Sequence, residues 1–565
     1  MFDLLIKNGR IVDGSGMPAY HGDIGIAAGR IVELGRLGGK AARVIDAEGN
    51  VVAPGFIDNH CHYDAQVNWD PLCSFSCYHG FTTVVTGNCS LTLAPVRPQD
   101  RLRLAGMLSH VEGIPIEVLE AGVPWNWETF PEYMQAIGAR LGVNVAPLVG
   151  HTAIRLYAMG EASQQRSATD AEIAVMKDAV RCSMQAGALG LSVTRNMTHF
   201  DVHGKLIPGA CAPDAELFAL ADVLRELGTG VIQCGGGTEP ELNERLLSRL
   251  SQASGRRVLY NTLIEQARAP GRWKEHLAHV EAVAREGIRA IPLCCPNPVN
   301  QRFNMQNCQV FDTLPNWAPV QRATGPEKLL AYADAGFRRK VRVDLEAPVG
   351  LRSTFSGRWD LMWIDEPALQ KNRGLKGRTV AGLAQAQGKH PLDAFLDLVV
   401  EEGLKTEFLL GQFNTDSAAM GEMLRSPYAV IGLSDGGAHA QSISTASTST
   451  RLLGYWVREQ KIMSLEQAVR RLTFDSGNAF GIYDRGLLQP GMAADVVIFD
   501  PDTVNPGKED KVHDLPGNSW RLRELAEGIR CTIVNGQVLL ERGEHAGSYP
   551  GKVLRNAMRT FEHSA

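Results

Sequence analysis

The sequence predicts an α/β protein built on a (β/α)₈ barrel, with a small β domain that both chain ends form. Three observations predict this fold. Eight apolar runs that end in polar residues alternate with helical patterns through the middle of the chain, as parallel strands and crossover helices do. Strand patterns rich in turns occupy both ends. Roughly 130 residues separate the last two runs, far more than an ordinary strand-to-helix connection.

Hairpin patterns at both ends of the chain predict the β domain. Residues 6–12 and 533–539 share one pattern, in which an Asn-Gly pair interrupts apolar residues, and Asn-Gly is a strong signal for a tight β-turn. Residues 494–500 add another apolar strand. We therefore expect residues 1–54 and 485–565 to come together as one β-sandwich domain.

The eight apolar runs predict the barrel strands. They end near His60, Asn88-Cys89, His151, Arg195, Cys234, Asn261, Cys294-Cys295 and Asp435. Residues 169–172 and 464–467 are capping boxes, which begin amphipathic helices. We expect the barrel to span residues 55–484, with its chemistry at the C-terminal ends of the strands.

The long interruption between the seventh and eighth strands predicts an inserted subdomain or lid over residues 298–428. It contains Trp317, Trp359 and Trp363 and several prolines. These aromatic side chains would suit the wall of a substrate pocket, but packing of the insertion's own small core is the interpretation that we favour.

Two histidines at the end of the first barrel strand predict a metal site. His60 and His62 are two residues apart, so on a strand both imidazoles project from the same face. They can then bind one ion. A pair of histidines on a solvated strand face is the alternative, but the apolar run 51–57 before them indicates a buried strand.

The other strand ends supply the rest of a hydrolytic site. Strand two ends in Asn88 and Cys89, strand three in His151 and strand eight in Asp435. An imidazole-bound metal lowers the pKa of its water towards ~7 and polarises a carbonyl. Asp435 would take the water's proton and hand it to the leaving nitrogen. His151 is predicted to ligate the metal or to polarise the substrate carbonyl, with a structural histidine as the alternative.

Motifs along most of the chain resemble the amidohydrolase superfamily. They are Pro54-Gly55-Phe56-Ile57-Asp58-x-His60-x-His62, Ser434-Asp435-Gly436 and Gly486-x-x-x-Pro490-Gly491-x-x-Ala494-Asp495. More narrowly, residues 87–89, 149–151 and 547–555 resemble the D-aminoacylase, or N-acyl-D-amino-acid deacylase, branch. The resemblance implies a TIM barrel with a flanking β-sandwich, Zn²⁺ at the strand ends and hydrolysis of amide C–N bonds.

The resemblance also implies roles for four residues. It implies His60 and His62 as metal ligands, Cys89 as a ligand from strand two, and Asp435 as both ligand and proton shuttle. Cys89 would ligate as a thiolate, a form that the metal itself promotes.

The chain departs from the family pattern where that pattern has further histidines, at the ends of strands five and six. Residues 231–237 and 258–263 contain none, and residues 192–195 offer no lysine to bridge two metals. We therefore expect one Zn²⁺ per subunit. The family's basic residue for the substrate carboxylate is also missing.

Three side chains are predicted to contact the substrate. Arg195 would replace the lost anchor through a bidentate contact, His439 would approach the leaving group, and Asn261 ends strand six.

Three functions are compatible with these features. A mononuclear amidohydrolase, similar to N-acyl-amino-acid deacylases, is the interpretation that we prefer. A hydrolase of a cyclic amide, an imide or another C–N bond is one alternative. A non-catalytic scaffold that keeps the fold is the other.

Composition excludes several other classes of function. A net charge of −5 gives no electrostatic case for nucleic acid or an anionic membrane, and no apolar run could span a bilayer. Residues 1–9 lack a secretion signal, and eleven cysteines without disulfide-like spacing suit a reducing cytoplasm. We expect a cytoplasmic enzyme with a small-molecule amide substrate, and the resemblance also allows a homo-oligomer.

Overall fold

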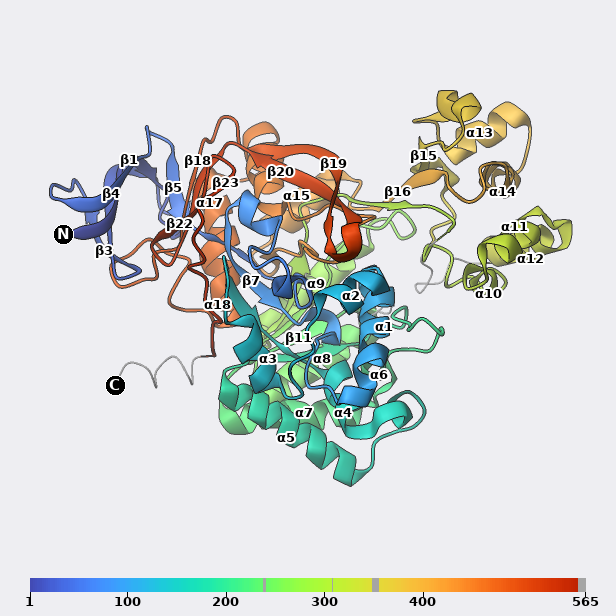
Figure 1. Cartoon of the computed structure of the whole chain (residues 1–565), viewed down its shortest axis with the longest axis horizontal. Helices are drawn as coiled ribbons and strands as arrows, with labels where there is room; N and C mark the ends of the chain where they lie inside the picture. The colour runs from blue at the N-terminus through green and yellow to red at the C-terminus, as the bar shows by residue number, and fades with distance from the viewer. Residues whose placement is uncertain (237–239, 307, 348–354, 557–565) are drawn as a thin grey trace.

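Eight parallel strands form the barrel. They are seen in a computed structural model that describes residues 1–236, 240–306, 308–347 and 355–556 (Figure 1). In chain order the strands are β6 (Phe56–Asp58), β7 (Phe81–Thr86), β8 (Asn144–Pro147) with its continuation β9 (Val149–Gly150), β10 (Gly190–Thr194), β11 (Val231–Gly235), β12 (Val258–Tyr260), β13 (Ala290–Cys294) and β17 (Val430–Ile431). Each of the eight apolar runs is one of these strands, and they follow one another along the chain in the predicted order.

The barrel is a closed ring. Strands β6 to β8 pair in parallel, and so do β9 to β13 and β17. Beyond β17 the chain meets the chain beyond β6: Asp435 N donates to His60 O at 3.1 Å, and His62 N donates to Gly436 O at 2.7 Å. These two bonds join the last strand to the first.

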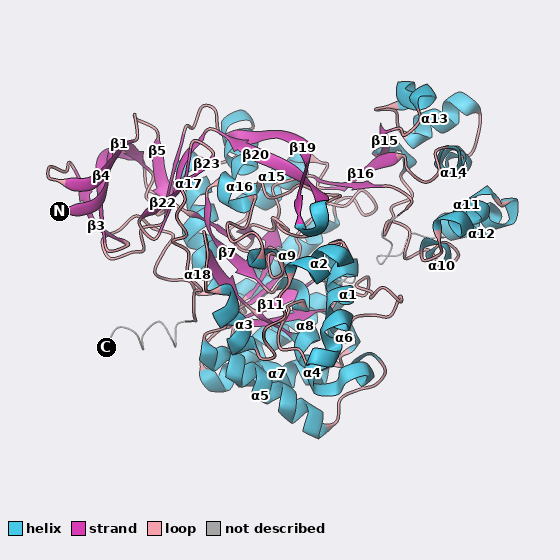
Figure 2. Cartoon of the chain, viewed as in Figure 1, coloured by secondary structure: helices cyan, strands magenta, loops and turns pink. Residues whose placement is uncertain are grey.

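Helices surround this ring (Figure 2). They are α1 (Arg101–Glu112), α2 (Ile116–Gly122), α3 (Phe130–Ile137), α4 (His151–Met159), α5 (Asp170–Ala186), α6 (Pro208–Cys211), α7 (Asp214–Leu227), α8 (Pro240–Ser254), α9 (Arg272–Arg285), α15 (Ser417–Arg425), α16 (Thr448–Arg451), α17 (Leu465–Arg470) and α18 (Ser476–Phe480). Both predicted capping boxes are present: Thr169 accepts from Glu172 N to begin α5, and Ser464 accepts from Gln467 N to begin α17. Each bond satisfies an N–H that the first helical turn leaves free.

Strands from both ends of the chain share one nine-stranded sheet. Its members are β1 (Phe2–Ile11), β2 (Tyr20–Ala27), β3 (Arg30–Gly35), β4 (Ala41–Asp46), β5 (Val51–Pro54), β18 (Val496–Phe499), β21 (Ile529–Val534), β22 (Gln537–Glu541) and β23 (Glu544–His545). The N-terminal β5 pairs antiparallel with β18, which also pairs with β21. The prediction that both ends of the chain form one β domain is therefore confirmed. The predicted limits of this domain, residues 1–54 and 485–565, and of the barrel, residues 55–484, stay proposals.

The segment between the seventh and eighth barrel strands forms a lobe with its own core (Figure 1). It contains β14 (Val299–Phe303), α10 (Ala318–Gln321), α11 (Gly325–Ala333), α12 (Ala335–Glu346), β15 (Met362–Glu366), α13 (Val380–Gln387), α14 (Pro391–Glu401) and β16 (Glu407–Phe413). Phe311 stacks on Trp317 at 3.9 Å between ring centroids, and Trp359 packs against Phe355. Trp317 and Trp359 thus pack the lobe's core, as favoured above; Trp363 lies half-buried on β15.

A long hairpin connects the lobe, the terminal sheet and the barrel. Its strands are β19 (Asn505–Leu515) and β20 (Ser519–Glu527). Leu522 N donates to Ala440 O at 2.7 Å, in the loop that follows β17.

Within the part of the chain that the structure describes, no helix combines the length and the apolarity needed to cross a bilayer.

A buried carboxylate ties the barrel to the terminal sheet. Asp495 accepts hydrogen bonds from Asn535 N at 2.7 Å and from Asn144 Nδ2, on barrel strand β8, at 3.0 Å. It also pairs with the buried Arg485. Removal of one partner from such a pair leaves a buried charge uncompensated.

We therefore predict that Asp495→Ala lowers the free energy of unfolding by about 3–5 kcal/mol. Urea denaturation followed by circular dichroism measures this change, and Asp502→Ala, which removes an exposed carboxylate, is the control. A loss within about 0.5 kcal/mol, as for ordinary surface substitutions, would contradict the structural role of Asp495.

Candidate metal centre

Four potential metal ligands gather where the ring of strands closes. His60 and His62 follow β6, Cys89 lies in a short turn after β7, and Asp435 follows β17. Cys89 has φ of 54° and Asp435 has φ of 49°, in the left-handed region that few non-glycine residues adopt. Such backbone strain clusters at functional sites. The fold thus holds the backbone of both residues in conformations that an unconstrained loop would avoid.

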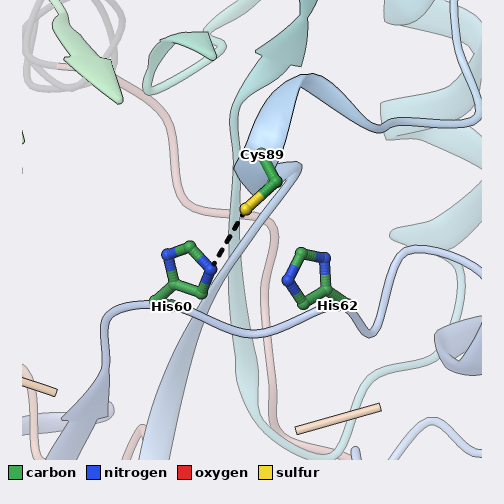
Figure 3. A group of neighbouring side chains, drawn as sticks. All are labelled: His60, His62 and Cys89. Carbon is green, nitrogen blue, oxygen red and sulfur yellow. Dashed lines mark hydrogen bonds between the residues drawn. The ribbon is translucent and has the colours of Figure 1, made fainter. Parts of the chain in front are cut away.

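The side chains of His60, His62 and Cys89 point toward one another (Figure 3). His60 Nε2 lies 3.6 Å from Cys89 Sγ and 3.5 Å from Asp435 Oδ1, which lies 3.7 Å from His62 Nε2. Ligand atoms of His60, His62 and Cys89 all lie within 4.8 Å of one another. Tetrahedral zinc, with bonds of about 2.1 Å to nitrogen or oxygen and 2.3 Å to sulfur, separates its donors by about 3.4–3.6 Å. His60, His62 and Cys89 therefore offer nitrogen and sulfur donors of the kind that zinc prefers, and Asp435 lies beside both imidazoles.

Burial sets the protonation of the candidate ligands. It lowers the pKa of His60 to about 3, which leaves that imidazole neutral with a free lone pair. Burial alone would lower the pKa of His62 as well, but the neighbouring carboxylate of Glu112 raises it well above its usual range. Burial raises the pKa of the Cys89 thiol. His62 and Cys89 must therefore release protons to bind a metal.

Asp435 is ionised in this environment. Burial would raise its pKa, but the hydrogen bond from His62 and the positive charge of that imidazole lower it to about 2. Its side chain keeps 31% of its surface exposed, whereas that of His60 is fully buried. Asp435 can therefore face both the imidazoles and a molecule that enters from solvent.

Asp58 holds the loop that carries Asp435. Its Oδ2 accepts from Ser434 Oγ at 2.7 Å and from Ser76 Oγ at 2.6 Å, and Ser434 Oγ accepts from Gly436 N at 2.9 Å. The side chain of Asp58 is buried. These bonds fix the backbone on both sides of Asp435.

Glu112 is a site residue that the sequence did not reveal. It ends α1, and its Oε1 lies 3.4 Å from His62 Nδ1 while its Oε2 lies 3.9 Å from His439 Nε2. Its carbonyl accepts from His439 N at 2.5 Å. A carboxylate beside the second nitrogen of a metal-binding imidazole is a common supporting contact. No local motif marks Glu112, because glutamates are mostly exposed and nothing in the neighbouring sequence indicates that this one is buried.

The predicted substrate contacts differ in where they lie. Asn261 reaches the metal centre, because its Nδ2 donates to Cys89 Sγ at 3.4 Å. His439 reaches it through Glu112. Arg195 instead donates to Ala212 O at 2.7 Å and to Asp214 Oδ1 at 2.8 Å. Its guanidinium is thus already engaged by the chain.

His151 does not join the four donors. It begins α4, and its Nε2 lies 2.7 Å from Glu216 Oε1 on α7. Glu216 also pairs with Arg155, and all three side chains are fully buried. This geometry corresponds to the structural histidine that the sequence left as the alternative.

His199 lies in the loop that follows β10, and the charges of His62 and His439 influence its pKa. Its Nε2 lies 2.9 Å from Asn196 Nδ2, so Nε2 accepts and the proton resides on Nδ1. Burial lowers the pKa of His199 to about 3, with contributions from the charges of His62 and His439. His199 is therefore neutral and carries its N–H donor on Nδ1.

Known proteins resemble the chain over nearly its whole length. A sequence profile of the amidohydrolase family matches residues 43–540. D-aminoacylase from Alcaligenes xylosoxydans xylosoxydans is 28% identical over 568 residues, which cover 98% of this chain and 97% of that protein. The crystal structure of N-acyl-D-glutamate deacylase from Bordetella bronchiseptica, complexed with zinc and a phosphonate mimic of the tetrahedral intermediate, has a TM-score of 0.68. It is 26% identical and covers 98% of this chain and 99% of its own.

A structure of D-aminoacylase bears on the number of metals. It matches with a TM-score of 0.67 and 25% identity, over 98% of this chain and 100% of its own. That protein has a binuclear metal centre with one-metal activation and second-metal attenuation.

The geometry predicts that His60 and His151 respond differently to truncation. His60→Ala removes a metal donor, so the protein should lose its bound metal. His151→Ala should retain the metal and lower the free energy of unfolding by about 1–3 kcal/mol, because the buried Glu216 loses a hydrogen bond. Elemental analysis after gel filtration and urea denaturation measure the two effects. Loss of the metal from folded His151→Ala protein would contradict this assignment.

Proposed function

The chain belongs to the amidohydrolase family, and we propose that it hydrolyses the amide C–N bond of a small N-acyl amino acid with one zinc ion held by His60, His62 and Cys89, with the Asp435 carboxylate beside the position that a catalytic zinc leaves open. The observation that carries this proposal is the convergence of His60, His62 and Cys89, with the Asp435 carboxylate beside both imidazoles, where the last strand meets the first. The deacylases among its relatives support the substrate class.

The proposed zinc ion would polarise the substrate carbonyl and lower the pKa of a water molecule. Asp435, ionised and partly exposed, accepts the proton of the attacking water and then donates it to the leaving nitrogen. Asp58 and Ser434 hold the Asp435 loop for this transfer. His439, with a quarter of its side chain exposed, and His199 offer N–H donors to the polar groups of the substrate.

We propose one metal ion per subunit. The family resemblance puts histidines at the ends of strands five and six, where this chain has Gln233 and Asn261. Amide side chains are poor zinc ligands compared with imidazoles. The zinc-bound deacylase among the structural relatives supports zinc as the ion.

We also propose a cytoplasmic location. All eleven cysteines lie in the described part of the chain, and all are free thiols. Thiols persist in a reducing compartment, whereas secreted proteins form disulfides.

Asp435→Asn should abolish most turnover. General acid–base catalysis contributes about 10²–10⁴-fold, so we expect at least a hundredfold fall in kcat with unchanged circular dichroism. Release of the free amino acid from a panel of N-acyl amino acids measures the rate. Asp500→Asn, in the terminal domain, is the matched control. Undiminished turnover by the folded Asp435 variant would refute the mechanism.

Removal of the metal should distinguish an enzyme from a scaffold. Chelation followed by gel filtration should leave inactive protein, and titration with Zn²⁺ should restore activity at about one equivalent per subunit. Cyclic amides are assayed in parallel with the N-acyl amino acids. Restoration that needs two equivalents would refute a mononuclear site. Turnover of cyclic amides alone would refute the substrate class.

A further inference from the structure

A closed ring of hydrogen bonds surrounds Cys89. Cys89 N donates to Gln233 Oε1 at 2.9 Å, and Gln233 Nε2 donates to Asn261 Oδ1 at 2.9 Å. Asn261 Nδ2 then donates to Cys89 Sγ at 3.4 Å. The ring therefore begins at the backbone of Cys89 and returns to its sulfur.

The backbone N–H of Cys89 determines the orientation of both amides. A side-chain amide can usually be turned by 180°, which exchanges its donor and its acceptor. A backbone N–H can only donate, so Gln233 must present its oxygen to Cys89 and its nitrogen to Asn261. Asn261 must then accept with its oxygen, and its N–H group has to face the sulfur.

A second, independent contact requires the same orientation. Ser90 N donates to Ser192 Oγ at 2.8 Å, and Ser192 Oγ donates to Gln233 Oε1 at 2.8 Å. Since the Ser90 N–H uses the hydroxyl as an acceptor, the hydroxyl proton is free to point at Gln233. The hydrogen bonds from Cys89 N and from Ser192 Oγ therefore both require the oxygen of Gln233 to face Cys89. The side-chain amide of Gln233 is buried and that of Asn261 is partly buried.

Two glycines allow this arrangement. A Cβ at Gly235 would lie 3.1 Å from Cys89 Cα, and a Cβ at Gly236 would lie 1.6 Å from Asn261 O. Larger residues would separate the ends of β11 and β12 from Cys89. The close approach of these segments is therefore built into the sequence that follows β11.

We infer that Gln233 and Asn261 are positioning residues that hold Cys89 as the terminal ligand of a single metal ion. The amide of Asn261 lies on the side of the sulfur that a second metal ion would have to approach. The N–H group withdraws electron density from the sulfur and orients its remaining lone pairs toward His60. An N–H dipole also repels a cation on that face. This inference depends on the proposed function only in taking Cys89 as a ligand.

Cobalt substitution tests this role without any measurement of turnover. Co²⁺ bound by a thiolate has a sulfur-to-metal charge-transfer band in the near ultraviolet. In Asn261→Leu, which keeps the approximate volume but removes the N–H group, we expect this band to move to longer wavelength, because the sulfur lone pair rises in energy. We also expect the affinity for Zn²⁺, measured by competition with a chelator, to fall about 10- to 100-fold, as for other supporting contacts of metal ligands.

Two further variants separate positioning from general destabilisation. Gln233→Glu keeps an oxygen for the Cys89 and Ser192 donors but removes the Nε2–H group that orients Asn261, so it should produce the same shift in the band with a smaller loss of affinity. Asn556→Ala removes another buried amide, which bonds to Met184 O and Ala188 O. It should change neither the band nor the affinity.

The outcomes distinguish this inference from the proposed function. The charge-transfer band should be present in the wild-type protein and absent from Cys89→Ser. If the wild-type protein has no such band, or if Cys89→Ser keeps it, Cys89 is not a ligand and the proposed ligand set fails. If the band is present but Asn261→Leu leaves both its position and the Zn²⁺ affinity unchanged, the positioning role fails and the metal site stands. A loss of affinity in Asn556→Ala equal to that in Asn261→Leu would also overturn the positioning role.

Discussion

The closure of the barrel between its last and first strands is the constraint on which the site depends. The bonds from Asp435 N to His60 O and from His62 N to Gly436 O complete the ring, and they involve the candidate metal ligands themselves. The bonds that close the ring therefore also bring the candidate ligands together. Any change that separates β17 from β6 would also separate the carboxylate from the two imidazoles, although these residues lie more than 370 positions apart along the chain.

The energy needed to build this site comes from its surroundings. Cys89 and Asp435 adopt left-handed backbone conformations, and His60, His62 and Cys89 lie away from solvent. Strain of this kind persists only where packing and hydrogen bonds overdetermine the backbone. Asp58 on one side and the ring of Gln233 and Asn261 on the other supply those bonds. The site is thus held from two directions, by strand one and by strands five and six.

Arg302 connects the inserted lobe to the same loop. Its backbone N donates to Ser442 O at 2.8 Å, in the loop that carries Asp435 and His439. Its side chain donates to Asp365 Oδ2 of the lobe at 2.8 Å and to Glu509 Oε1 of the β19–β20 hairpin at 2.7 Å. One residue therefore joins the lobe, the hairpin and the loop after β17, and the lobe's separate aromatic core lets it act as a unit.

Local patterns in the sequence determined the eight barrel strands, the strand-rich ends and the two paired imidazoles. Each of these follows from side chains a few positions apart, through the alternation of a strand or the capping of a helix. Only the tertiary structure decided that His151 binds Glu216, that Arg195 binds Asp214, and that Glu112 lies beside His62. It also decided that Asn261 contacts the sulfur of Cys89, 172 positions away. Contacts of this kind depend on how the strands are staggered around the closed ring, and no short stretch of sequence encodes that stagger.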